Sequence, residues 1–165
     1  MKRVISIAWM VLVGGAAACS DANVAGNYTA QITNGADGCS LGLTKDQNLT
    51  ADFIVTQDGS DVSLRIEGFS GGFISLLAGS AVLTGNVDGD DVNVERIGTV
   101  KKTEMSCEYM VNVQIKASQD GDSMSGRVEY RAATNADPTC GSRQNCISVQ
   151  EFNATRPPRS SGSAE

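Results

Sequence analysis

Residues 107–132, CEYMVNVQIKASQDGDSMSGRVEYRA, decide the fold of this chain. Apolar and polar residues alternate along Cys107–Ala117 and again along Met124–Ala132, and a short polar turn separates the two series. A period of two is typical of strands that bury one face. The Asp120-Gly121 pair between the two series is among the strongest short signals for a tight hairpin. This stretch therefore predicts an antiparallel β-hairpin.

The same signal recurs at Asp58-Gly59 and at Asp88-Gly89, each time between two alternating segments. Alternation and turn residues together indicate an all-β fold, an antiparallel meander of about eight strands. We expect these strands at about residues 24–33, 49–57, 62–66, 81–87, 92–100, 107–117, 124–132 and 147–156.

Closure into an up-and-down β-barrel would remove the unpaired edges of this meander, and a β-sandwich is the alternative. Residues 24–156 then form a single β domain, and residues 157–165 a disordered tail that begins at Pro157-Pro158. Because strand direction alternates, the three Asp-Gly turns share one end with both ends of the domain. The longer connections share the other end: residues 34–48, 68–80, 101–106 and 133–145.

The connection 68–80 is unusually apolar for a loop. Burying one large apolar side chain contributes roughly 1.5–3 kcal/mol, so we expect this segment to fold over the core. It would act there as a plug in the barrel or as a lid over an apolar ligand. The side chains concerned are Phe69, Phe73, Ile74, Leu76 and Leu77.

Several classes of chemistry are disfavoured by composition. Gly68-Phe69-Ser70-Gly71-Gly72 matches the Gly-x-Ser-x-Gly nucleophile elbow. The chain contains no histidine, however, which excludes Ser-His and Cys-His nucleophile systems and the usual zinc ligand sets. The aspartates near the three turns are explained by turn chemistry rather than by calcium binding. We therefore expect no enzyme, no metal and no cofactor.

The N-terminus carries a targeting signal. Lys2 and Arg3 precede an apolar run over residues 4–18, which is shorter than the roughly 20 residues that span a bilayer. This arrangement predicts a secretory signal peptide over residues 1–18. Its exit, Ala16-Ala17-Ala18-Cys19-Ser20, resembles the lipobox of bacterial lipoproteins.

That resemblance implies that Cys19 is lipidated, with palmitate among its acyl chains, and that residues 19–23 form a membrane tether. Ser20 after the cysteine points, by the family's sorting rule, to the outer membrane of the cell envelope. Loss of Lys2 and Arg3 with the signal moves the formal net charge from −6 to about −8, which disfavours nucleic acid as a partner.

Lipidation of one of the five cysteines leaves an even number, which suits two disulfides in an oxidising compartment. The four remaining residues are Cys39, Cys107, Cys140 and Cys146. Nearness in sequence favours a Cys140–Cys146 bond, which leaves Cys39 with Cys107. A four-thiolate metal site is disfavoured because no C-x2-C pair is present.

A second resemblance concerns the two ends of the domain. Gly26-Asn27-Tyr28 resembles the Gly-x-Trp opening of lipocalin-like (calycin) barrels, and Arg156 stands where those barrels place a basic residue across the opening aromatic. The stretch from Cys146 to Pro158 is also similar to uncharacterised bacterial lipoproteins. The resemblance implies a barrel and conveys no activity.

Three classes of function remain in order of preference. The first is a lipid-anchored envelope module that binds a small apolar ligand. The alternative is a structural or protein-interaction module of the outer membrane with a packed barrel interior, and an enzyme comes third. A continuous interior cavity of about 300 Å³ or more would favour the ligand-binding module.

Lipidation is tested by Cys19→Ser. We expect this change to abolish fatty-acid labelling and to release the protein from the membrane fraction, because the acyl chains are the only anchor that we predict. Fractionation and metabolic labelling measure both effects. Unchanged labelling would contradict the assignment.

Overall fold

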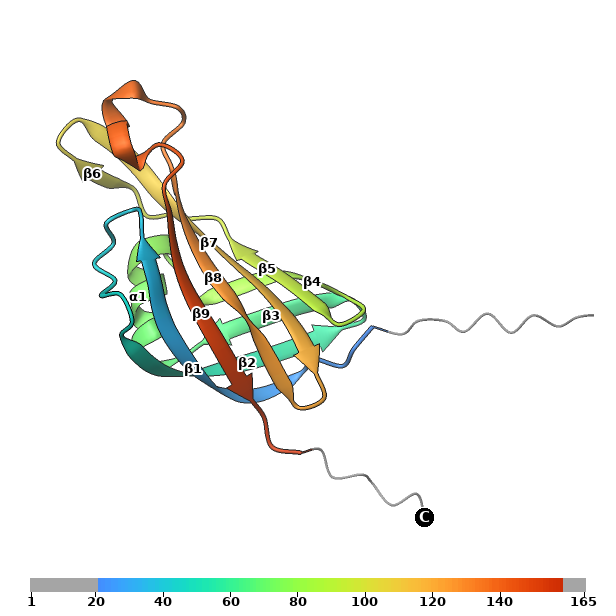
Figure 1. The fold of residues 1–165 in the computed structure, drawn as a ribbon. Helices are drawn as coiled ribbons and strands as arrows, with labels where there is room; N and C mark the ends of the chain where they lie inside the picture. The colour runs from blue at the N-terminus through green and yellow to red at the C-terminus, as the bar shows by residue number, and fades with distance from the viewer. Residues whose placement is uncertain (1–20, 159–165) are drawn as a thin grey trace, which may run out of the picture.

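Eight antiparallel strands close into a barrel in the computed structural model, which describes residues 21–158 (Figure 1). Each strand pairs with the next one along the chain, β5 pairs with β7, and the last strand pairs with the first. This arrangement confirms the predicted barrel. The barrel strands are β1 (Gly26–Asp37), β2 (Asn48–Asp58), β3 (Asp61–Ile66), β4 (Val82–Asp88), β5 (Asp91–Arg96), β7 (Cys107–Asp120), β8 (Ser123–Ala133) and β9 (Ile147–Thr155).

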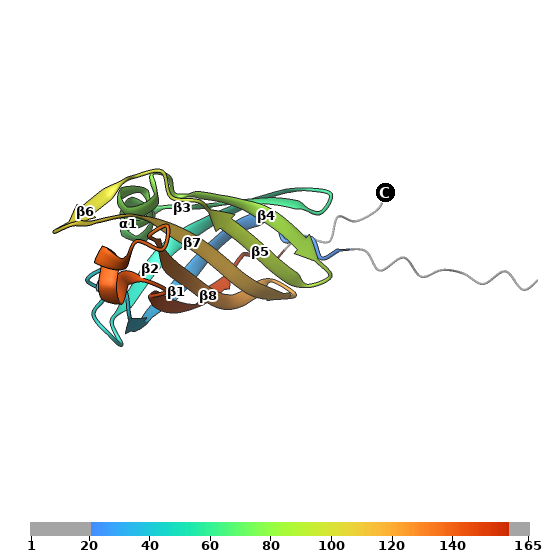
Figure 2. The same cartoon turned by 90° about the horizontal axis from the view of Figure 1, so that it is seen from above.

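One end of the barrel carries the three Asp-Gly turns. The first loop residue of each is a glycine with a positive φ of 58–61°, a value that favours glycine over other residues. Both ends of the domain also lie here: the Ala22 amide donates to the Gly89 carbonyl at 2.8 Å and the Arg156 amide to the Asp122 carbonyl at 3.0 Å (Figures 1 and 2). We call this end the turn end.

The opposite end, which we call the rim, holds the longer connections (Figure 2). Three of them contain regular structure where only loops were predicted. Two of the three elements are the short strand β6 (Lys102–Glu104), which pairs with β7, and the 3₁₀ helix η1 (Pro138–Arg143). The strand expected over residues 92–100 is shorter, because β5 ends at Arg96.

The apolar segment 68–80 is a helix, α1 (Gly68–Ala78), and the expectation of a loop was wrong. Gly79 ends it in the left-handed conformation, with a φ of 87°, and its amide donates to the Ser75 carbonyl at 2.8 Å. Gly71 allows the helix to turn back onto the end of β3. A Cβ atom at this position would lie only 2.1 Å from the Ile66 carbonyl oxygen.

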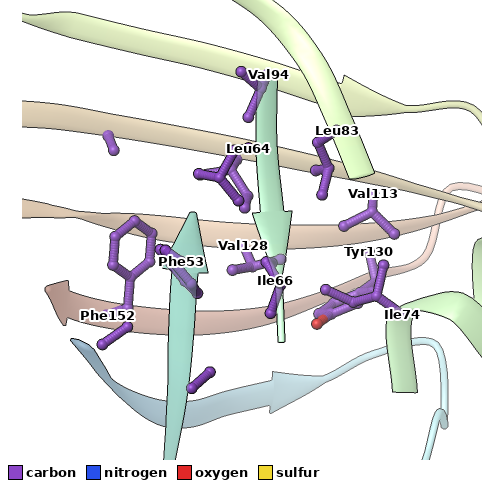
Figure 3. Close-up of a cluster of buried hydrophobic side chains, with 14 of the residues drawn as sticks. Phe53, Leu64, Ile66, Ile74, Leu83, Val94, Val113, Val128, Tyr130 and Phe152 are labelled. Atoms are coloured by element: carbon purple, nitrogen blue, oxygen red, sulfur yellow. The ribbon is translucent and has the colours of Figure 1, made fainter. Parts of the chain in front are cut away.

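Side chains fill the barrel interior (Figure 3). The inward positions of every barrel strand contribute to one apolar cluster, in which the Phe53 and Phe152 rings meet edge to face with their centroids 5.1 Å apart. Helix α1 adds Ile74 and Leu77 to this cluster, with 1% and 6% of their surfaces exposed. Ile74 projects from the helix towards the side of the cluster that holds Val113 and Tyr130.

Arg156 ties the two ends of the domain together at the turn end. Its guanidinium carbon lies 5.2 Å from the centroid of the Tyr28 ring. Its Nη1 donates to the Ala25 carbonyl at 2.6 Å, and its Nε pairs with Asp122 at 3.0 Å. This is the contact between Arg156 and the opening aromatic that the lipocalin-like resemblance implies. Membership of that family stays a prediction.

None of the helices within residues 21–158 has the length and hydropathy needed to cross a bilayer. The predicted signal peptide, the lipidated Cys19 and most of the expected disordered tail lie outside the described residues.

The two sides of α1 predict different effects on stability. Ile74→Ala should lower the free energy of unfolding by about 2–5 kcal/mol, because it leaves a cavity among buried side chains. Leu76→Ala should change it by less than about 0.5 kcal/mol, because 68% of the Leu76 surface is exposed. Urea denaturation of both variants measures the difference. Equal destabilisation would show that the helix does not bury Ile74 selectively.

Candidate functional site at the disulfide-braced rim

Two disulfides brace the rim. Cys39 bonds to Cys146 with a Cα–Cα distance of 5.0 Å, and Cys107 bonds to Cys140 with a Cα–Cα distance of 4.6 Å. The four cysteines therefore form two disulfides as expected, but the expected pairing was wrong. The positions of the segments explain it. Cys39 lies just beyond the β1–β9 pairing, where the Gly38 amide donates to the Ile147 carbonyl at 3.1 Å, next to Cys146.

Asp37 holds the connection from β1 to β2. Its carboxylate accepts three backbone amides, from Leu41, Gly42 and Leu43, at 2.9–3.0 Å, and the Ser148 hydroxyl at 2.7 Å. Burial alone would raise the pKa of Asp37, but these hydrogen bonds outweigh burial and lower it. The carboxylate therefore stays ionised and fixes the loop against β9.

Arg143 connects η1 to the rest of the rim. Its Nη1 donates to the Cys39 carbonyl at 2.6 Å, and its guanidinium carbon lies 4.6 Å from the centroid of the Tyr109 ring. The same guanidinium pairs with Glu104 on β6. Together with the two disulfides, these contacts join all the rim connections except α1.

The outward side of α1 carries exposed apolar side chains. Phe69 and Leu76 have 75% and 68% of their surfaces exposed. Seven residues correspond to about two helical turns, so the two side chains lie on the same side of the helix. Lys102 on β6 donates from its Nζ to the Leu76 carbonyl at 3.3 Å, which places β6 beside this surface. We call Phe69 and Leu76 the apolar stripe.

A small pocket lies between α1, the loop after β1 and the rim ends of β1, β2 and β9. Its volume is about 120 Å³. We call it the rim pocket. Its lining is entirely uncharged: apolar walls come from Leu43, Leu49, Phe69 and Phe73, and the remaining surface from Asn34, Gly42, Gln47, Ser70 and Gln150.

A series of buried hydrogen bonds connects the core to this pocket. The Tyr130 hydroxyl donates to Gln150 Oε1 at 2.6 Å, Gln150 Nε2 donates to Asn34 Oδ1 at 2.6 Å, and Asn34 Nδ2 donates to the Thr44 carbonyl at 3.0 Å. Burial raises the pKa of Tyr130, so its hydroxyl keeps its proton. Ser70 stands apart from this series: its Oγ is buried and has no hydrogen-bond partner.

Comparison with known proteins finds no matching family model, no similar curated protein and no similar solved structure.

Four hollows are larger than the rim pocket, and all are open grooves on the outside of the barrel, with volumes of about 510, 430, 330 and 260 Å³. Outward-facing polar residues such as Thr84, Lys116 and Thr29 line the first three, and the fourth lies at the turn end beside Gly59. They are not parts of the barrel interior. A continuous interior cavity of 300 Å³ would have to displace the buried side chains of the core.

The elbow-like motif contains Ser70 in the first turn of α1, and its hydroxyl has no base beside it. Within residues 21–158, no three histidine, cysteine or acidic side chains are grouped so that they could hold a metal ion. The rim carries two features that a ligand or partner could contact, the apolar stripe and the rim pocket.

Phe69 and Phe73 were predicted to lie in a functional segment, but Asn34, Ser70 and Gln150 were not predicted to meet in one pocket. A signal for two of them was present. Asn34 continues the inward series Tyr28, Ala30, Ile32, and Gln150 lies in register opposite Asn34 on β9. A polar residue at an inward position requires a partner, and these two are partners of each other.

Removing each disulfide tests the bracing. The chain-entropy estimate gives about 5 kcal/mol for Cys39–Cys146 and about 4 kcal/mol for Cys107–Cys140, because the first closes 107 residues and the second 33. The paired serine variants should lose stability in this order in urea denaturation. Peptide mapping without reductant that recovered Cys140 bonded to Cys146 would contradict the assignment.

Proposed function

We propose that this chain is a lipid-anchored lipoprotein of the bacterial cell envelope whose barrel serves as a rigid protein-interaction module. The filled interior carries this proposal. The inward side chains of eight strands, with Ile74 and Leu77 of α1, occupy the space in which a lipid-carrying barrel would hold its ligand. The rim pocket, at about 120 Å³, is well below the roughly 300 Å³ of an ordinary ligand cavity.

The orientation of the barrel follows from its N-terminal contacts. Asp21 Oδ1 accepts the Gly89 amide at 3.1 Å, and Gln57 Nε2 donates to the Ala22 carbonyl at 3.1 Å. If Cys19 carries the acyl chains, only Ser20 separates the anchor from residues bound to the turn end. The turn end then faces the membrane, and the rim faces away from it.

The apolar stripe is the surface that this orientation presents to a partner. Exposed apolar side chains that share one side of a rigid element are typical of protein interfaces, in which aromatic anchors carry much of the binding energy. Burial of Ile74 and Leu77 in the core holds α1 in place, so the partner meets a surface that needs little ordering. We therefore assign Phe69 as the anchor and Leu76 as its neighbour.

Site-specific photocrosslinking in intact cells tests this function. A photoreactive residue at position 76 should give one discrete protein adduct, and Phe69→Ser in the same chain should reduce its yield at least about fivefold, as loss of an anchor does. The matched control places the photoreactive residue at Thr84, which is exposed on the outer face of β4 and should give no such adduct.

Equal adducts from positions 76 and 84, or an adduct that is indifferent to Phe69→Ser, would contradict the proposed surface. Urea denaturation of Phe69→Ser provides the control for folding. This variant should unfold at the wild-type urea concentration, because most of the Phe69 side chain is exposed.

A further inference from the structure

We infer that the rim pocket binds a small neutral molecule that has an apolar body and one hydrogen-bond acceptor, and that this acceptor receives the hydroxyl proton of Ser70. This site is separate from the proposed docking surface, although Phe69 borders both. It would be present whether or not the apolar stripe engages a protein.

The unpartnered hydroxyl of Ser70, a residue of the pocket wall, is the basis of this inference. Only 4% of its surface is exposed, it lines the pocket, and its Oγ has no hydrogen-bond partner. A buried hydroxyl without a partner destabilises the folded state. Most buried polar groups are satisfied, so an exception at the wall of a pocket points to a missing partner inside that pocket.

The other buried polar side chains of the pocket, Asn34 and Gln150, are already engaged. Asn34 Oδ1 accepts from Gln150, and Gln150 Oε1 accepts from the Tyr130 hydroxyl. Asn34 Nδ2 is directed to the Thr44 carbonyl. Among the buried polar side chains of the pocket, Ser70 is therefore the one left to donate to a ligand, and the ligand must supply the acceptor.

The charge and size of the pocket restrict the ligand. No charged side chain lines it, and transfer of a charge into such a site is costly without a partner, so the ligand is neutral. A volume of about 120 Å³ is close to that of engineered apolar cavities of about 150 Å³ that hold benzene. The class is therefore a molecule of one ring, or a short-chain ketone, ester or alcohol. A lipid is too large.

The two phenylalanines define how this molecule would be held. Phe73 is fixed, because its ring meets the Tyr130 ring edge to face with centroids 5.9 Å apart. Phe69 forms the outer wall and is mostly exposed. Apolar contact with a ligand would cover part of Phe69, while the ligand's acceptor faces Ser70.

Two matched probes separate a hydrogen-bonded ligand from simple apolar filling. Cyclohexanone carries a ring and a carbonyl acceptor, and methylenecyclohexane has nearly the same shape without the acceptor. In titrations of the detergent-solubilised, isotope-labelled protein, followed by NMR, we expect cyclohexanone to shift the amide signals of Ser70 and Gln150 saturably. Ser70→Ala should raise the dissociation constant for cyclohexanone roughly three- to tenfold and leave that for methylenecyclohexane unchanged.

Ser75→Ala is the control variant, because it removes a hydroxyl from the same helix at a position outside the pocket. It should leave the binding of both probes unchanged. Ser70→Ala should also melt at or above the wild-type temperature, because it removes an unpartnered buried hydroxyl.

Absence of saturable shifts with cyclohexanone would overturn the inference. So would equal effects of Ser70→Ala on both probes, or no effect on either, since the pocket would then hold only water or bind by apolar contact alone. A melting temperature well below that of the wild type would show that Ser70 has a structural partner and would equally overturn it.

Discussion

The pairing of β1 with β9 is the constraint on which the rest of the structure depends. It closes the ring, and an eight-stranded ring has an interior just wide enough for side chains to fill. The same register sets both ends of the barrel. At the turn end it brings Arg156 against Tyr28, and at the rim it places Asn34 opposite Gln150 and leads into the Cys39–Cys146 disulfide.

Closure also gives the two ends of the barrel different structures. The turn end holds three two-residue loops and both ends of the described domain. The rim uses long connections, and these supply a helix, an extra strand pair, both disulfides and a pocket. Function in such a fold is expected on the connections, because the strands hold them rigidly in place. The proposed anchor at Cys19 would point this variable end away from the membrane.

Local signals predicted the strands and turns, because alternation and Asp-Gly pairs act over a few residues. The features that the sequence analysis missed depend on contacts between distant segments. Helix α1 has an apolar side chain on its exposed side at Leu76 as well as on its buried side at Ile74, so no polar face marked it as a helix. The disulfide pairing depends on where η1 crosses the rim, and nearness in sequence gave the wrong partner for Cys140. The rim pocket forms only where three separate parts of the chain meet.

The central claim is that side chains, and not a lipid, fill the barrel. Native mass spectrometry of the detergent-extracted protein tests it most directly, because a lipid bound in the interior would be retained as a non-covalent adduct. We predict the mass of the chain with its covalent acyl groups and no further adduct of lipid size. A stoichiometric adduct of several hundred daltons that is lost only on unfolding would contradict the filled interior.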